Sequence, residues 1–329
     1  MATVTMTKET TNGTTTGVNG HTNGSLISGD VEVSLNYYLD PSLGGITHYT
    51  PGSAGVYRRK FDTRKVVIHD MRGRESEFNI HKQSFEVAPF TTACKDFVDS
   101  EIKSVMYAEA QELLKKITGC TSVHTFSHLV RRDTAESNEA TLAALEAAAG
   151  DKQIPDNQAM GKVVPARFAH IDQSPNGARR LLQDNLGADV AEKLAKTRWG
   201  IVNIWRPIKT IRRDPLALCD SRTIKDEELA IVKSTLPKKG SGQGYYDGVS
   251  KGDGFETLEL RYGPDHDWWY VSELTPEEAL VFKIFDSKRS VKGRSGHTSF
   301  IDPRTSQFAT RESMELRSFV FYEDEPQED

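Results

Sequence analysis

The chain has 329 residues, of which 27% are charged and 37% hydrophobic, and its formal net charge is −5. It is long enough for one large domain or two ordinary ones, and its mildly acidic balance without a basic block argues against a nucleic-acid partner. No apolar run approaches the length of a membrane span, the N-terminus lacks the apolar core of a secretory signal, and the three cysteines are widely spaced. We therefore expect a cytoplasmic protein with reduced thiols and no membrane partner.

Residues 1–31 are rich in Thr, Asn, Gly and Ser and contain few large apolar side chains. Such a segment cannot bury enough apolar surface to offset the entropy lost on ordering, so we expect a disordered N-terminal tail. We expect a single domain over residues 32–329.

Apolar spacing predicts a short strand near Val66–Ile68, a helix over Asp96–Thr118 and a strand over Ser122–Val130. Residues 134–162 form a long Ala-, Asn- and Glu-rich insertion with one helical piece near Ala140–Ala149. Loops of this length inside a compact domain are uncommon, and active-site lids and disordered excursions are two explanations.

The second half of the chain reads as two short helices followed mainly by strands. The helices are predicted at 178–186 and 188–197, and the strands at 201–207, 216–220, 257–262, 268–271, 297–301 and 314–322, with 257–262 paired to 268–271. Thr275-Pro276-Glu277-Glu278 has the spacing of a capping box and predicts a further helix to about Phe285. The glycine-rich segment 240–254 reads as a mobile loop. Together these elements predict a mainly β fold with flanking helices, either an antiparallel sandwich or a jelly roll.

The segment His170-Ile171-Asp172 follows an apolar run and precedes the turn-prone Ser174-Pro175-Asn176-Gly177. On a strand, side chains two apart share one face, so His170 and Asp172 can converge on one point. An imidazole nitrogen and a carboxylate oxygen there are two thirds of the 2-His-1-carboxylate triad that holds Fe(II). Of the nine histidines, His297 opens a late strand-like run and suits the third position.

Arg311-Glu312-Ser313 follows His297 by fourteen residues (311 − 297 = 14). The planar guanidinium of an arginine pairs with a carboxylate in bidentate fashion, and a nearby hydroxyl adds a hydrogen bond. If the metal site belonged to a 2-oxoglutarate enzyme, the distal carboxylate of that cosubstrate would need such a cation, and Arg311 with Ser313 could supply it, unless Arg311 pairs with a surface carboxylate. Arg206, at the end of the 201–207 strand, is the other candidate for a cosubstrate or substrate contact, and Asn203 could reach the same pocket.

Five segments together resemble the Fe(II)/2-oxoglutarate-dependent oxygenase superfamily, and more narrowly the fungal hydroxylase/desaturase group that includes gibberellin desaturase. The segments are His170–Ala178, Asn203–Ile208, Asp214–Asp220, His297–Pro303 and Arg311–Arg317. The resemblance implies a double-stranded β-helix (jelly-roll, cupin-like) core and an Fe(II) site of His170, Asp172 and His297. It also implies 2-oxoglutarate and O₂ as cosubstrates, with ascorbate as a candidate reductant.

The implied reaction oxidises a small molecule of fungal secondary metabolism and releases succinate and CO₂. Hydroxylation, desaturation and oxidative cyclisation share one triad, so the motif does not choose among them. The alternatives are a non-catalytic cupin-like binding protein and a zinc hydrolase using the same His/Asp/His site. We expect a monomer or homodimer. The segments 134–162 and 240–254 are predicted lids, with Tyr245 and Tyr246 as candidate substrate contacts.

Overall fold

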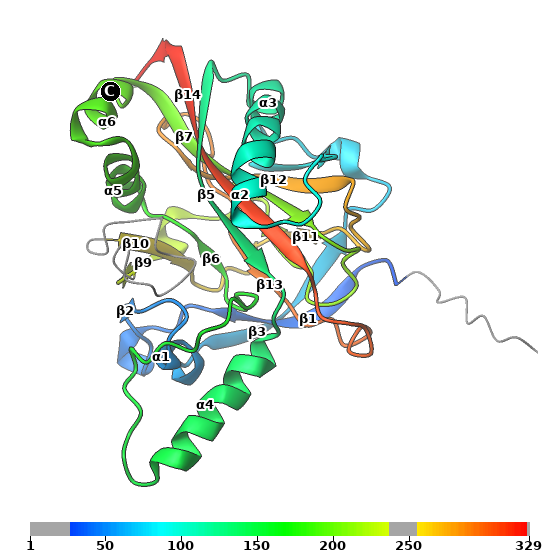
Figure 1. The fold of residues 1–329 in the computed structure, drawn as a ribbon, viewed down its shortest axis with the longest axis vertical. Coiled ribbons are helices and arrows are strands. Elements are labelled where there is room, and N and C mark those ends of the chain that lie inside the picture. The colour runs from blue at the N-terminus through cyan, green and yellow to red at the C-terminus, as the bar shows by residue number, and fades with distance from the viewer. Residues whose placement is uncertain (1–26, 237–254, 328–329) are drawn as a thin grey trace, which may run out of the picture.

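The structure is a computed structural model that describes residues 27–236 and 255–327. Two β-sheets dominate it (Figure 1). The five-stranded sheet has the order β4 (Phe85–Pro89), β12 (Glu278–Asp286), β7 (Thr197–Pro207), β14 (Ser313–Pro326), β5 (Ser122–Arg131). The nine-stranded sheet has the order β1 (Val31–Tyr37), β3 (Asp62–Asp70), β11 (Trp268–Tyr270), β8 (Leu216–Cys219), β13 (His297–Ser299), β6 (His170–Ile171), β10 (Phe255–Leu260), β9 (Leu229–Ser234), β2 (His48–Tyr49).

The two sheets share one apolar core. Ile201, Trp205 and Phe319 of the five-stranded sheet are buried in the same cluster as Leu218 and Leu258 of the nine-stranded sheet. The five-stranded sheet is also covered on its outer face, where a second apolar cluster forms. Its central strand β7 is therefore buried on both faces, which explains why apolar side chains of this strand, such as Ile201 and Ile204, enter both clusters.

The described helices flank the two sheets, and α5 and α6 add Leu181, Leu182 and Ala191 to the shared core. They are α1 (Ala54–Arg58), α2 (Asp99–Glu101), a π-helical turn (Ile102–Met106), α3 (Tyr107–Thr118), α4 (Ala135–Ala149), α5 (Pro175–Leu186) and α6 (Ala188–Leu194), with 3₁₀ turns at Pro41–Leu43, Glu75–Glu77, Ser221–Thr223 and Asp226–Glu228. The apolar stripe of α3 packs on the outer face of the five-stranded sheet through Ala110 and Leu114. Gly119 ends α3 with a φ of 72°, a left-handed conformation that glycine adopts without strain. No helix of the described residues is long and apolar enough to cross a membrane.

The insertion 134–162 is folded back on the segment around α1. Figure 1 shows α4 extending away from the two sheets. The chain then returns, and Gly55 N donates to Asp156 O at 2.9 Å while Met160 N donates to Gly52 O at 2.9 Å. Leu142 and Met160 pack on Ala54 in a small cluster of their own. Both the helix of the insertion and its returning part are thus held against the segment around α1.

Two sequence predictions are wrong. Thr275–Glu278 forms only a turn, with Thr275 N donating to Glu278 Oε2 at 2.9 Å, and the chain continues as strand β12. The reason is that the apolar run Ala279–Ile284 is buried in the five-stranded sheet, which overrides a local helix signal. Strands β10 and β11 exist as predicted, but they do not pair with each other: β10 pairs with β6 and β9, and β11 pairs with β3 and β8.

Three residues of the predicted tail, Gly29, Asp30 and Val31, take part in the fold. Gly29 N donates to Asp70 Oδ2 at 2.8 Å, Asp70 N donates to Asp30 Oδ1 at 3.0 Å, and Val31 pairs with Ile68. Residues 1–26 of the predicted tail, and the predicted loop 240–254 with Tyr245 and Tyr246, lie outside the described residues.

Candidate metal centre and active site

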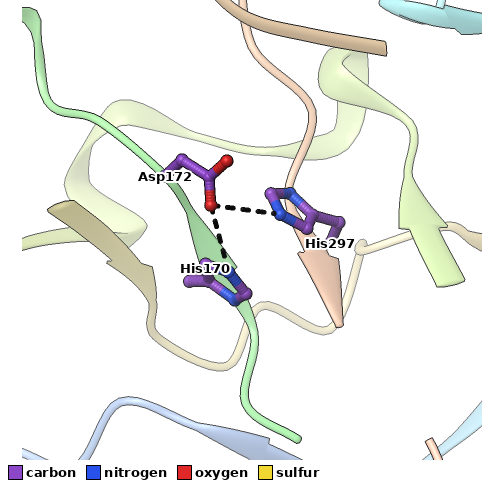
Figure 2. A group of neighbouring side chains, drawn as sticks. All are labelled: His170, Asp172 and His297. Atoms are coloured by element: carbon purple, nitrogen blue, oxygen red, sulfur yellow. Dashed lines mark ion pairs between the residues drawn. The ribbon is translucent and has the colours of Figure 1, made fainter. Parts of the chain in front are cut away.

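Three side chains from neighbouring strands of the nine-stranded sheet meet at one point (Figure 2). Asp172 Oδ1 lies 3.4 Å from His170 Nε2 and 3.5 Å from His297 Nε2. One potential ligand atom from each residue lies within 4.8 Å of the others. Because metal–ligand bonds to nitrogen and oxygen are about 2 Å long, a small inward adjustment lets one ion contact all three atoms. The sequence prediction of this convergence is confirmed.

Local structure fixes how Asp172 leaves its strand. β6 is short because Ser174 caps α5: its Oγ accepts a hydrogen bond from Gly177 N at 3.0 Å, and Pro175 occupies the first turn of the helix. Ser174 Oγ also donates to Glu256 Oε2 at 2.9 Å, which ties the cap to strand β10. The turn expected at Ser174–Gly177 is therefore the start of helix α5. Its capping hydrogen bonds hold the backbone close to Asp172.

The two imidazoles are oriented by backbone carbonyls. His170 Nδ1 lies 2.8 Å from Phe168 O, and His297 Nδ1 lies 3.4 Å from Ser295 O. A carbonyl only accepts hydrogen bonds, so these contacts favour a proton on Nδ1 and direct Nε2 of each ring at Asp172. This arrangement is typical of histidine ligands of metals.

The second oxygen of Asp172 is held from the opposite sheet. Asn203 Nδ2 on β7 donates to Asp172 Oδ2 at 2.9 Å, and Arg317 Nε on β14 lies 3.7 Å from the same oxygen. Burial by itself would raise the pKa of Asp172, but hydrogen bonds with His170 and His297 and the charges of His297 and Arg317 hold it well below its ordinary value. The carboxylate is therefore kept ionised, with Oδ1 directed at the two histidines.

Glu315 on β14 is a site residue that the sequence did not single out. Asn203 Nδ2 donates to its Oε1 at 2.7 Å, Arg317 Nε lies 3.2 Å from Oε1, and Arg131 Nη1 on β5 donates to Oε2 at 2.9 Å. Burial opposes ionisation of Glu315, but the charges of Arg317 and Arg131 keep its pKa below the ordinary value. The available signal was period two along β14, which places Ser313, Glu315 and Arg317 on one face.

Arg311 lies just before β14 and is buried. Its Nη1 donates to Asp214 O at 2.6 Å and to Ser299 Oγ at 3.2 Å, and its guanidinium stacks 5.2 Å from the ring centre of Trp205. Its Nε has no hydrogen-bond partner among the described residues. Burial, followed by the charge of Arg131, lowers the pKa of Arg311 to about 9. Arg311 is therefore a buried cation whose charge is poorly compensated, rather than half of a surface ion pair.

The structure separates the remaining predicted residues. Ser313 is buried at the start of β14, and its Oγ has no partner among the described residues. Arg206 points to the outer face of the five-stranded sheet, where it contacts Pro276 O and lies over the rings of Phe90 and Phe97. Because Asn203 and Arg206 are three apart on one strand, they face opposite sides, and only Asn203 reaches the triad.

Two cavities meet beside the triad. A small one is lined by His170, Asp172, His297 and Arg311, together with Arg131, Trp205, Phe282 and Glu315. A larger one, of about 400 Å³, adjoins His170 and Asp172. Its walls are mostly aromatic and aliphatic and include Tyr49, Tyr57, Phe61, Phe168 and Phe255, and the insertion contributes Ala135, Glu139 and Lys162.

A two-sheet core that presents two histidines and one aspartate to a cavity is typical of a mononuclear metal-dependent enzyme of the oxygenase type. The model of an oxidoreductase family, described as "Oxidoreductase/YMDC permease-like domain", matches residues 35–321. Hydroxylase/desaturase efuI of Hormonema carpetanum is 37% identical over 91% of this chain and 97% of its own length. Hydroxylase/desaturase CTB9 of Cercospora beticola is 35% identical over 90% of this chain and 88% of its own length.

Two further matches carry cofactor names. The alpha-ketoglutarate-dependent dioxygenase phiK of a fungal species is 30% identical over 89% of this chain and 97% of its own. The solved structure of the iron and alpha-ketoglutarate-dependent endoperoxidase NvfI superposes with a TM-score of 0.68 at 22% identity, over 89% of this chain and 98% of that one. The superposition confirms the predicted jelly-roll core. The chain belongs to this oxidoreductase family of fungal hydroxylase/desaturases, and it is a dioxygenase whose cofactor is Fe(II) and whose cosubstrates are 2-oxoglutarate and O₂.

Proposed function

We propose that the chain oxidises a small molecule of secondary metabolism by hydroxylation, desaturation or oxidative cyclisation, with His170, Asp172 and His297 as its Fe(II) ligands. The observation that carries this assignment is the convergence of their three ligand atoms within 4.8 Å. The donor set fits Fe(II), because two neutral imidazoles and one carboxylate on one side of an ion leave positions for further ligands. Bound iron with 2-oxoglutarate and O₂ supplies the oxidising power, and the protein supplies position and dryness.

Arg311 is the proposed anchor of the distal carboxylate of 2-oxoglutarate, with Ser313 as a hydroxyl neighbour. Arg311 lines the same small cavity as the triad, and its guanidinium is buried without a paired carboxylate among the described residues. A dicarboxylate placed between the metal and Arg311 would compensate that charge. Trp205 and Phe282 line the cavity and exclude water from it, which strengthens the ion pair.

The larger cavity is the proposed substrate site. It adjoins His170 and Asp172, so a molecule held there presents its carbon–hydrogen bonds to the metal. Its aromatic and aliphatic lining favours a compound with a substantial apolar body, whereas Gln173 and Thr257 offer polar contacts. The insertion 134–162 closes one side through Glu139 and Lys162 and acts as a lid, a role that we also assign to 240–254 with Tyr245 and Tyr246.

We also propose a cytoplasmic enzyme that acts as a monomer or homodimer. The cytoplasmic assignment is supported by Cys94, Cys120 and Cys219, which are buried free thiols, as is usual for proteins of a reducing compartment.

Conversion of a metabolite tests the proposed function. The protein is loaded with Fe(II) and 2-oxoglutarate without oxygen, exposed to air with a panel of fungal metabolites, and analysed by mass spectrometry. We expect succinate together with a product that has gained one oxygen atom or lost two hydrogen atoms. Metal-dependent hydrolysis without consumption of 2-oxoglutarate would instead support a zinc hydrolase.

A further inference from the structure

Arg131 occupies a position that the assigned roles leave unexplained. It is the last residue of β5, pairs across the sheet with Ser313, and lines both the small cosubstrate cavity and the larger substrate cavity. Its side chain is 13% exposed. Burying an arginine at a junction of two cavities is costly unless its charge is used there.

Only two of the three guanidinium nitrogens of Arg131 make hydrogen bonds to other described residues. Nη1 donates to Glu315 Oε2 at 2.9 Å, and Nε donates to Val164 O at 3.3 Å. The remaining nitrogen, Nη2, makes no hydrogen bond to another described residue. The guanidinium is therefore fixed in orientation by two contacts while its third nitrogen stays available to a ligand.

Arg131 and Arg311 approach the small cavity from different directions. Arg311 is anchored on Asp214 O and Ser299 Oγ. Arg131 is connected to the metal ligands instead, because Glu315 binds Asn203 and Asn203 binds Asp172 Oδ2. Two like charges beside one cavity repel each other unless an anion lies between them. The pair thus suits a ligand with a negative group at each end, one near Arg311 and one near the metal.

We propose that Arg131 binds the C1 carboxylate of 2-oxoglutarate, the one next to the keto group, while Arg311 binds the distal carboxylate. This inference rests on the proposed function of the site. Glu315 positions Arg131 for that contact, and Asn203 and Arg317 hold Glu315 from its other oxygen. Because Arg131 also borders the substrate cavity, it separates the charged cosubstrate from the apolar substrate.

The experiment compares two ligands that differ only at C1. 4-Oxopentanoate keeps the keto group and the distal carboxylate of 2-oxoglutarate but carries a methyl group in place of the C1 carboxylate. Dissociation constants are measured by calorimetry on Mn(II)-loaded protein, which binds without turnover. Arg131→Met should weaken 2-oxoglutarate by about tenfold or more and leave 4-oxopentanoate within about twofold, whereas Arg311→Met should weaken both.

Arg132→Met is the matched control, because Arg132 is the neighbouring residue, its side chain is 50% exposed and it lines neither cavity. It removes the same charge and should leave both affinities unchanged. Arg131→Met leaves Glu315 Oε2 without its arginine partner, so the double variant Arg131→Met with Glu315→Gln also removes that negative charge, and it should not restore binding of 2-oxoglutarate.

Three results would overturn the inference: unchanged affinity for 2-oxoglutarate in Arg131→Met, equal weakening of both ligands in that variant, or recovery in the double variant. Failure of the wild-type Mn(II) protein to bind 2-oxoglutarate would instead reject the proposed function itself, so the two failures are distinguishable.

Discussion

Asn203 Nδ2 lies 2.9 Å from Asp172 Oδ2, and this contact spans the two sheets of the barrel. It occupies the carboxylate oxygen that does not face His170 and His297. Asn203 was expected to reach the cosubstrate, but the structure places its amide on the carboxylate ligand. We infer that Asn203 orients Asp172. It does so from the facing sheet and lines neither of the two cavities.

Replacing Asn203 with alanine should therefore weaken the metal site. Removing a hydrogen-bond partner of a metal ligand typically costs about ten- to a hundredfold in metal affinity. Titration of the apoprotein with Fe(II) under anaerobic conditions measures the loss. Thr125→Val is the control, because it removes a buried 2.9 Å hydrogen bond between Thr125 and Ser318 without touching Asp172 or its partners. Equal losses in both variants would contradict a specific role for Asn203.

Arg311→Lys keeps the charge but loses the planar fork. We expect it to weaken 2-oxoglutarate by about 1.5–3 kcal/mol, or about ten- to a hundredfold, while the primary substrate is affected less. The apparent constants for the two compounds, measured in the same assay, test this. An unchanged constant for 2-oxoglutarate would assign the anchor to another arginine, but Arg206 is disfavoured because it faces the outer side of β7.

Arg311→Met tests the role of Arg311 through the thermal stability of the protein with and without ligands. Because burial lowers the pKa of Arg311 and no carboxylate pairs with it in the described part of the chain, an apolar replacement should not destabilise the ligand-free protein. Thermal unfolding should show that 2-oxoglutarate with metal raises the melting temperature of the wild type but not of this variant. A marked loss of stability in the ligand-free variant would show that Arg311 is structural.

Shortening the insertion 134–162 should uncouple the reaction. Removal of the part that contributes Glu139 and Lys162 opens one wall of the substrate cavity, so water reaches the site and succinate forms without product. Metal binding should remain. Trimming only the exposed end of α4, residues 143–152, is the control and should leave the ratio of succinate to product unchanged, since none of those residues lines the cavity. If the ratio of succinate to product were the same in the wild type and both shortened variants, the insertion would not act as a lid.

Limited proteolysis gives a second test of the predicted lids. We expect cleavage first within residues 1–26, then in the segments 134–162 and 240–254. The cuts in these two segments should slow when metal, 2-oxoglutarate and substrate are present. Cleavage rates that do not respond to ligands would argue against closure of either segment.

The effect of an N-terminal deletion on the free energy of unfolding should depend sharply on the residue at which the deletion ends. Removing residues 1–26 should change the free energy of unfolding by less than about 0.5 kcal/mol. Removing residues 1–31 also deletes the contacts of Gly29 and Asp30 with Asp70 and the buried Val31, and it should cost about 2 kcal/mol or more. Chemical denaturation of both truncations measures the difference. Identical stabilities would show that Gly29–Val31 contribute little to the fold.

The triad could be predicted because its information is local: His170 and Asp172 are two apart on a strand, and His297 opens another strand. Glu315 and Arg131 could not, because their roles arise from the pairing of β14 with β5 and β7, which no short window of sequence contains. The helix expected after Thr275 failed for the same reason, since pairing with β4 and β7 outweighs a capping signal. Arg206 stands three residues after Asn203 on β7, so strand alternation places its side chain on the outer face, over Phe90 and Phe97.

The most direct test of the account is the visible absorption of the anaerobic Fe(II) protein on addition of 2-oxoglutarate. Chelation of Fe(II) by the keto acid produces a charge-transfer band, and no substrate is needed. The wild type should develop this band, whereas Ala variants of His170, Asp172 and His297 should not, while their circular dichroism stays close to that of the wild type. Absence of the band in wild-type protein that has bound Fe(II), or its persistence in all three variants, would contradict the assignment of an iron and 2-oxoglutarate site to these residues.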